Sequence, residues 1–187
     1  MALTRRAFLA SAAAGVAQQR AGRPNIVVIL ADDLGYGDLG CYGQKRIQTP
    51  NIDKLAAEGT RFLQAYSGST VCAPSRCVLM TGKHTGHSTV RGNHDPEIPI
   101  RRDEATIGTV LKAAGYRNAA FGKWGLGANQ DDGTPLQRGY DEFFGYMNHW
   151  HAHQAFPDYL WEGRREFRLI NNWFHQRKVF APDLFAD

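Results

Sequence analysis

Five residues with reactive or charged side chains stand in short, motif-like stretches of this sequence. Asp32 and Asp33 follow the apolar run "NIVVIL", Cys72 and Arg76 lie in "CAPSRCVLMTG", and Lys123 lies in "YRNAAFGKW". Two adjacent carboxylates repel each other, and holding both ionised usually requires a cation. Their hard oxygen atoms favour Ca²⁺ or Mg²⁺ over zinc. A lone Asp-Asp pair also starts turns, so the metal interpretation depends on the motifs around it.

The predicted position of Cys72 suits reactive chemistry. Pro74 and Ser75 predict the start of a helix, and Gly82 predicts its end. Cys72 would then lie at the positive end of a helix, where backbone N–H groups and the helix dipole favour an anion. A thiol in this position can be a nucleophile of low pKa. The alternative for any single cysteine is a small buried apolar residue.

Strand and helix signals alternate around these residues. Residues 25–30 form a continuous, β-branched apolar run that is typical of a strand buried on both faces. Thr49 and Gly59 bracket a predicted helix, and residues 60–66 predict a second strand. A further helix is predicted over 103–115 with Asp103 as its cap, and it is followed by a predicted strand in 116–124.

This alternation predicts a three-layer α/β/α fold around a mostly parallel sheet. In such folds ligands bind outside the carboxyl ends of the strands. Asp32 and Asp33 follow the first predicted strand directly, and Lys123 ends the last one. The candidate residues therefore belong at the ligand-binding edge of the predicted sheet.

Composition excludes some classes of protein. The chain has 187 residues, 43% of them hydrophobic, which is enough for one domain with a sizeable core. Its formal net charge of +4 includes Arg5 and Arg6 of the N-terminal segment. Because the remaining charges are nearly balanced, the sequence argues against a nucleic-acid binder, which needs a clustered basic face.

The N-terminal residues 1–22 resemble an export signal. The apolar run from Ala7 to Ala17 is too short for a transmembrane segment but suits a signal peptide. The preceding "TRRAFL" resembles a twin-arginine signal, and an ordinary Sec signal is the alternative. We therefore expect an exported protein, periplasmic or extracellular. In such a compartment we interpret Cys41 and Cys77 as small buried residues or as a disulfide pair.

Four segments, in this order, resemble the sulfatases of the alkaline-phosphatase-like superfamily. "ADDLGYGDLGCYG" resembles their metal-binding opening, and "TPNIDKLAAEG" resembles the helix that follows. "CAPSRCVLMTG" matches the signature Cys-x-Pro-Ser-Arg-x-x-x-x-Thr-Gly, and "GYRNAAFGKWGLG" resembles the second signature. The resemblance begins at Arg23 and covers the chain to its last residue.

The resemblance implies a sulfuric ester hydrolase. In this family a maturation enzyme oxidises the signature cysteine, here Cys72, to Cα-formylglycine, whose hydrated form attacks the sulfur of a sulfate ester. Asp32 and Asp33 would bind Ca²⁺, with Mg²⁺ or Mn²⁺ as alternatives, and modified Cys72 would complete part of its shell. Arg76 would hold the diol, and Lys123 would contact the sulfate. A sulfated carbohydrate is the expected substrate, and an aryl sulfate is the model substrate.

The sequence departs from the family at one catalytic position. Many relatives have a histidine two residues after the lysine, where this chain has Gly125. The stretch "HWHAH" offers His149, His151 and His153 as substitutes. We nominate His153. Packing within an aromatic region is an equally good interpretation, because His-x-His-x-His alone fixes no metal geometry.

The resemblance also concerns the length of the chain. Sulfatases of this kind have several hundred residues, and their later half supplies further metal ligands and a leaving-group histidine. We therefore expect residues 23–187 to be the N-terminal portion of a C-terminally truncated sulfatase domain, which alone lacks a complete active site. Two alternatives stay open. One is a phosphonate monoester or phosphodiester hydrolase of the same superfamily, and the other is an inactive truncated remnant.

Overall fold

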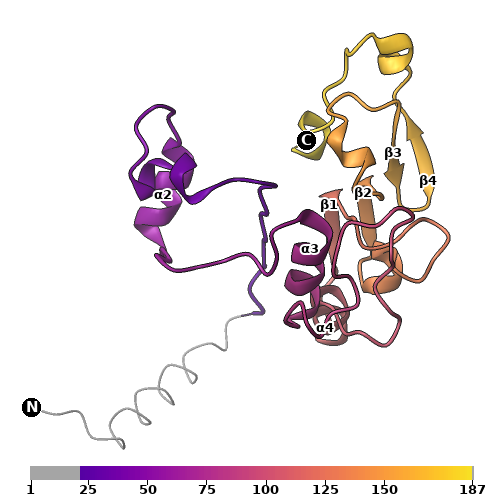
Figure 1. Cartoon of the computed structure of the whole chain (residues 1–187), viewed down its shortest axis with the longest axis horizontal. Coiled ribbons are helices and arrows are strands. Elements are labelled where there is room, and N and C mark those ends of the chain that lie inside the picture. The colour runs from indigo at the N-terminus through magenta and orange to yellow at the C-terminus, as the bar shows by residue number, and fades with distance from the viewer. Residues whose placement is uncertain (1–21, 187) are drawn as a thin grey trace, which may run out of the picture. The chain divides into compact units, whose positions relative to one another are not determined.

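The computed structural model describes residues 22–186, and these form two compact units, 22–59 and 60–186 (Figure 1). The predicted export signal, with Arg5 and Arg6, lies outside the described residues apart from its last residue, Gly22.

The first unit is built from short helices. Helix α2 (Pro50–Glu58) begins with the proline and ends at Gly59, as predicted. Two 3₁₀ turns, η1 (Tyr36–Asp38) and η2 (Gly40–Tyr42), precede it. Side chains at the start of α2 fix η2, because Thr49 Oγ1 accepts from the N–H of Gly40 at 2.9 Å.

Two strand predictions were wrong. Residues 25–30 and 60–66 have no regular secondary structure, and their apolar side chains are exposed, with Val27 at 80% and Ile29 at 86%. An apolar run becomes a strand only when a neighbouring strand accepts its backbone hydrogen bonds. In residues 22–186 the only sheet is built from four other segments.

That sheet lies in the second unit and has the order β1-β2-β3-β4 (Figure 1). Strand β1 pairs with β2 in parallel, whereas β2–β3 and β3–β4 are antiparallel. The sheet is therefore mixed rather than mostly parallel. For β3 and β4 the reason is local, because the tight turn at Gly163, whose φ is 60°, joins them directly and such a turn makes antiparallel neighbours. The strands are β1 (Ala119–Lys123), β2 (Glu142–Tyr146), β3 (Tyr159–Glu162) and β4 (Arg165–Arg168).

Two α-helices belong to this unit. Helix α3 (Cys72–Thr81) begins at Cys72 itself, two residues earlier than the Pro74–Ser75 start that we predicted, and it ends at Gly82 in a left-handed conformation. Helix α4 (Ile107–Ala113) is capped by Thr106 and not by Asp103. The Thr106 hydroxyl accepts from the N–H of Thr109 at 3.2 Å and donates to the Arg138 carbonyl at 2.8 Å. This second bond explains why Thr106 serves as the cap.

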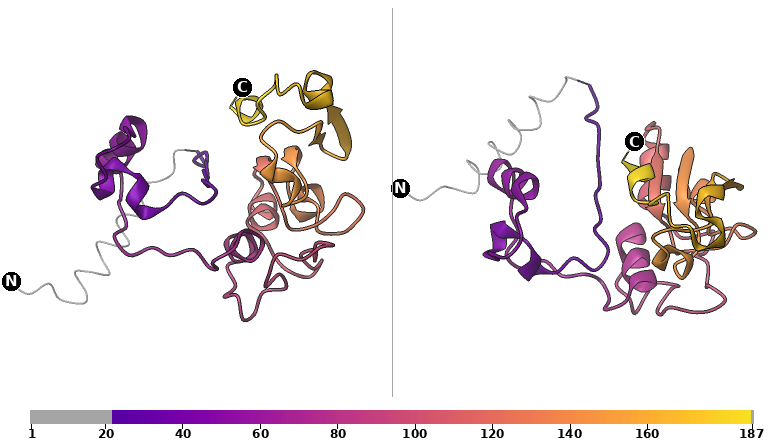
Figure 2. Two further views of the ribbon diagram at one scale, coloured as in Figure 1. Left: turned by 45° about the horizontal axis from the view of Figure 1, so that its top comes forward. Right: turned by 90° about the horizontal axis from the view of Figure 1, so that it is seen from above.

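Side chains on both faces of β2 pack against other parts of the same unit, whose ribbon is drawn from two further sides in Figure 2. Phe143 packs in a core with Ala73 and Cys77 of α3. Phe144 and Tyr146 point to the opposite face and pack with residues from the C-terminal segment. The alternation of side chains along a strand thus gives a sheet with one core on each face, which confirms an α/β architecture. The C-terminal segment contains the 3₁₀ turns η5 (Ile170–His175) and η6 (Asp183–Phe185), and the unit also contains η3 (Pro135–Arg138) and η4 (His151–His153).

Candidate active site

Cys72 is the first residue of α3, and a loop residue holds its side chain. The amide Nδ2 of Asn93 lies 3.2 Å from Cys72 Sγ, and Asn93 Oδ1 accepts from the N–H of Ala73 at 3.1 Å. The sulfur is half-buried at the N-terminal end of the helix, where an anion is favoured. Asn93 was not predicted as a site residue, because one asparagine in the polar stretch "RGNHD" gives no signal of this contact.

Arg76 joins α3 to the end of β1. It lies one helical turn after Cys72 and is 7% exposed. Its Nη1 donates to the backbone carbonyl of Lys123 at 2.6 Å. The structure therefore brings the helix that carries Cys72 and the strand end that carries Lys123 into direct contact. The carboxyl end of β1 is where ligand-binding residues were expected.

Gly125 lies beside Arg76 and His149. Its φ is 71°, in the left-handed region that favours glycine. A Cβ at this position would lie 3.1 Å from His149 Cβ and 3.8 Å from Arg76 Cδ. His149 therefore occupies the space that a side chain at position 125 would need.

His149 forms a buried pair with Glu97. The side chains are 0% and 3% exposed, and Glu97 Oε1 accepts from the backbone N–H of His149 at 2.5 Å and contacts its Nδ1. The other ring nitrogen, Nε2, is buried and has no hydrogen-bond partner among the described residues. Burial raises the pKa of Glu97, and hydrogen bonds from His149 oppose that rise.

The other two histidines of "HWHAH" have different surroundings. The His151 ring packs 4.5 Å from Tyr159 and 5.2 Å from Tyr146, and burial lowers its pKa. His153, which we nominated, is exposed, and its ring lies 6.1 Å from that of Trp150. The packing interpretation therefore fits His151, and the geometry favours His149 as the histidine of the candidate site.

Asp32 and Asp33 lie in an exposed turn of the first unit. Asp33 has a φ of 58°, a left-handed conformation that aspartate tolerates better than most residues. Their carboxylates suit a hard cation such as Ca²⁺, but they are two donors out of the six to eight that it normally takes. Residues 22–186 contain no group of three or more His, Cys, Asp and Glu side chains that could hold a metal ion.

The other cysteines do not form the disulfide that we considered. No disulfide links Cys41, Cys72 and Cys77, all of which are described. Cys77 is completely buried in the core under α3, and burial raises the pKa of its thiol. Cys77 is therefore the small buried residue of the alternative interpretation.

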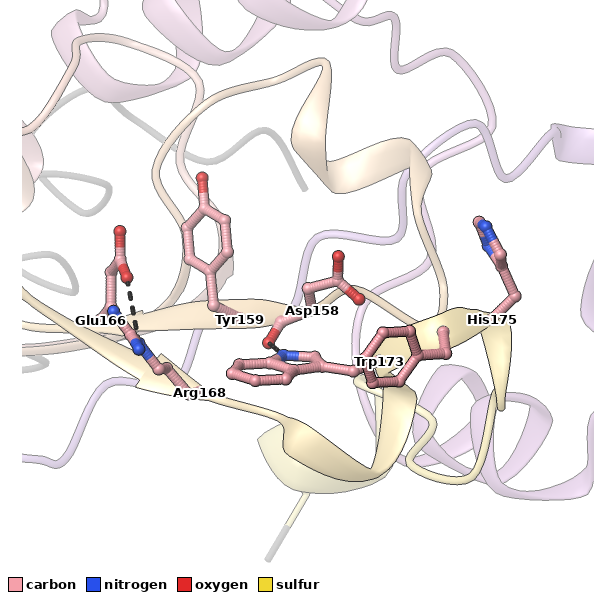
Figure 3. Close-up of a pocket in the computed structure, with 7 residues that line it drawn as sticks. Asp158, Tyr159, Glu166, Arg168, Trp173 and His175 are labelled. Atoms are coloured by element: carbon pink, nitrogen blue, oxygen red, sulfur yellow. Dashed lines mark hydrogen bonds and ion pairs between the residues drawn. The ribbon is translucent and has the colours of Figure 1, made fainter.

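A separate cavity of about 490 Å³ opens between the β3–β4 hairpin and η5 (Figure 3). None of the residues predicted as site residues from the sequence lines it. The indole of Trp173 forms part of its wall and donates to the backbone carbonyl of Asp158 at 3.2 Å. The lining residues are Asp158, Tyr159, Glu166, Arg168, Trp173, Phe174 and His175.

Within residues 22–186, no helix has the length and apolar character needed to cross a membrane. Residues 24–184 match a protein-family model described as Sulfatase. The chain is 42% identical over 135 residues to N-acetylgalactosamine-6-sulfatase of Rattus norvegicus, covering 67% of this chain and 26% of that protein. It is 43% identical over 148 residues to arylsulfatase A of Homo sapiens, covering 75% of this chain and 28% of that protein.

Two solved structures are also similar to this chain. The structure of BT4656 in complex with its substrate D-glucosamine-2-N,6-O-disulfate aligns with a TM-score of 0.69 at 29% identity, covering 87% of this chain and 29% of that one. The PsFucS1 sulfatase from Pseudoalteromonas sp. aligns with a TM-score of 0.60 at 34% identity, covering 74% of this chain and 29% of that one. The chain thus spans about a quarter of the length of the curated relatives that it matches.

Proposed function

The chain belongs to the sulfatase family, and on that premise we propose that it carries the nucleophile of a sulfuric ester hydrolase. One observation supports this most strongly. Cys72, inside the matched motif "CAPSR", begins α3, contacts Asn93, and lies one turn before Arg76, which is bonded to the end of β1.

The nucleophile would be Cys72 after oxidation to formylglycine by a maturation enzyme. The hydrated aldehyde has two hydroxyl groups, and one attacks the sulfur of the ester while the alcohol leaves. The second hydroxyl then loses its proton, its C–O bond becomes a carbonyl, and the bond from carbon to the sulfate oxygen breaks. Sulfate leaves and the aldehyde is restored. A serine lacks the second hydroxyl and therefore this route.

The residues around Cys72 suit the charge that this reaction develops. Negative charge builds on the sulfate oxygens and on the leaving oxygen, and fixed positive groups stabilise it. The positive end of the α3 dipole lies there, and it acts through the dipole because the Ala73 N–H is bonded to Asn93, Pro74 has no N–H and the Ser75 N–H is bonded to the Val71 carbonyl. Arg76 of α3 would hold the diol, and Lys123 at the end of β1 would contact the sulfate.

Asp32 and Asp33 would provide part of a site for Ca²⁺, with Mg²⁺ or Mn²⁺ as alternatives, and modified Cys72 would be a further ligand. A divalent cation at this position would lower the pKa of the attacking hydroxyl and neutralise sulfate charge. The two aspartates supply hard oxygens, as such a cation requires. Export by the twin-arginine or Sec machinery and a periplasmic or extracellular location belong to the same proposal.

The substrate class that we propose is a sulfated carbohydrate. The support is the likeness to N-acetylgalactosamine-6-sulfatase and to the structure of BT4656 in complex with a disulfated glucosamine. The superfamily resemblance keeps a phosphodiester or phosphonate monoester as the competing substrate class.

The test compares a sulfate ester and a phosphodiester of the same phenol. It uses a protein in which the part of this chain that aligns with arylsulfatase A, 75% of the chain, replaces the matching segment of that enzyme, and in which Cys72 has been converted. We expect hydrolysis of the sulfate ester, lost in the Cys72→Ala and Asp32→Asn variants. Faster hydrolysis of the phosphodiester would favour the competing class. Turnover that persists in Cys72→Ala would contradict the proposed nucleophile.

A further inference from the structure

Three buried side chains, Glu97, His149 and Arg76, lie close to one another. The Glu97 side chain is 3% exposed and Arg76 is 7% exposed, so both charges lie largely outside water. A buried charge is costly unless a group of opposite charge or a hydrogen-bonding partner compensates it. His149, which is 0% exposed, contacts Glu97 directly and lies next to Arg76.

The contacts define how the imidazole of His149 is oriented. Glu97 Oε1 accepts from the backbone N–H of His149 and contacts its Nδ1, and the oxygens of an ionised Glu97 can only accept. Nδ1 then carries the proton, and Nε2 is left with a lone pair. Because Nε2 is buried and has no hydrogen-bond partner among residues 22–186, this lone pair can receive a donor without losing an existing bond.

The absence of a side chain at Gly125 leaves room for the side chains of His149 and Arg76 to lie close together. The point where its Cβ would stand is 3.1 Å from His149 Cβ and 3.8 Å from Arg76 Cδ, so these two side chains approach each other across the glycine. The guanidinium of Arg76 is a donor at every nitrogen. An acceptor with a carboxylate behind it would stabilise a buried cation that donated a hydrogen bond to it.

We propose that Glu97 and His149 act as a positioning pair for Arg76, and through Arg76 for the diol of modified Cys72. Glu97 fixes the tautomer and the orientation of His149, and His149 Nε2 accepts from the Arg76 guanidinium. Arg76 Nη1, bonded to the Lys123 carbonyl at 2.6 Å, then has its plane fixed from two sides. This inference rests on the proposed function for its catalytic meaning. Its structural part can be tested without turnover.

The test measures hydrogen exchange of the Arg76 Nε–H by NMR on the ¹⁵N-labelled protein. Glu97→Gln removes the negative charge but keeps an oxygen acceptor, and His149→Phe keeps a ring and removes both nitrogens. In either variant we expect exchange at Arg76 to accelerate about tenfold or more, while the amides of β1 and β2 stay protected. In the wild type we expect ¹⁵N shifts of His149 with Nδ1 protonated and Nε2 unprotonated.

A matched control uses the buried carboxylate of Glu104, which pairs with Lys83 and Thr89 instead. Glu104→Gln should leave Arg76 exchange unchanged. Unchanged Arg76 exchange in Glu97→Gln, or an equal acceleration in Glu104→Gln, would overturn the proposal. If His149→Phe does not fold, the Glu97→Gln result decides.

Activity gives a second readout in the same variants. In the arylsulfatase A replacement protein, Glu97→Gln should lower kcat for an aryl sulfate about ten- to hundredfold, the usual effect of a residue that orients another active-site group, and change KM little. An equal loss in Glu104→Gln would also overturn the proposal. Absence of sulfate ester hydrolysis by the parent protein would contradict the proposed function, and the exchange rates would still decide the positioning role.

Discussion

The side-chain amide of Asn93 lies against the sulfur of Cys72, with Nδ2 3.2 Å from Sγ. The same side chain accepts from the N–H of Ala73 at 3.1 Å, so one asparagine contacts both the candidate nucleophile and the first turn of its helix. The two residues are 21 positions apart in the chain. A loop residue thus fixes the side chain that the motif places at the helix terminus.

The first prediction concerns this contact. Asn93→Asp keeps an oxygen that accepts from Ala73 but places a negative charge beside Cys72. Like charges disfavour the thiolate, so we expect alkylation of Cys72 at neutral pH to slow by about tenfold. Mass spectrometry of the peptides measures the rate, with Cys41 of the first unit as the internal reference. Equal rates at Cys72 in both proteins would show that the contact does not exist in solution.

A second prediction concerns Arg76. Its buried Nη1 bond to Lys123 uses the planar guanidinium, which the single ammonium of lysine cannot reproduce. We expect Arg76→Lys to lower the free energy of unfolding by about 1–3 kcal/mol, measured in urea. The control is Arg117→Lys, because Arg117 forms an exposed ion pair with Glu142. This substitution should change the free energy of unfolding by less than about 0.5 kcal/mol. Equal effects of the two substitutions would contradict the buried role of Arg76.

A third prediction gives a pH dependence. Burial raises the pKa of Glu104, but hydrogen bonds from Thr89 and Lys83 outweigh it and leave that pKa below its ordinary value of 4.5. Folding therefore favours the ionised form of Glu104. Its contribution to the free energy of unfolding is fully present above pH 4.5 and is lost as the pH falls through the lowered pKa. Glu104→Gln should cost about 1–3 kcal/mol at pH 7, and the difference should shrink at more acidic pH. A difference that is constant with pH would show that the charge of Glu104 contributes nothing.

The signals that predicted structure correctly are local. Helix α2 begins and ends where Pro50 and Gly59 indicated, and α3 ends at Gly82. Strand β1 ends at Lys123, inside the stretch that we predicted as a strand. The cap of α4 shows the limit of local reasoning. Asp103 and Thr106 both suit a cap, and only the bond from Thr106 to the Arg138 carbonyl distinguishes them.

The features that sequence analysis missed depend on contacts between distant residues. A buried strand at residues 25–30 requires a neighbouring strand, and the sequence of the run does not show whether one is present. Glu97 and His149 are 52 positions apart, and nothing in the sequence connected Glu97 with the stretch "HWHAH" that contains His149. The sequence offered three histidines with equal spacing, and burial beside Gly125 separates His149 from the other two.

A fourth prediction concerns export, and it rests on Arg5 and Arg6, which lie outside the described residues. A twin-arginine route reads the paired arginines, whereas a Sec route needs only a positive charge before the apolar run. Replacing both arginines by lysine should therefore stop export while the protein accumulates in the cytoplasm. Fractionation of a bacterial host measures the outcome. Export that continues at the wild-type level would favour the Sec route.

The central claim is that Cys72 is the precursor of formylglycine. The most direct measurement is mass spectrometry of the peptide that contains Cys72, together with labelling by a hydrazide probe, after co-expression with a formylglycine-generating enzyme. A synthetic peptide with a Cys-x-Pro-Ser-Arg motif serves as the positive control for that enzyme. We predict an aldehyde at Cys72 and a probe signal that is lost in Cys72→Ala. A Cys72 that remains a thiol while the control peptide is converted, or a probe signal that is unchanged in Cys72→Ala, would contradict the claim.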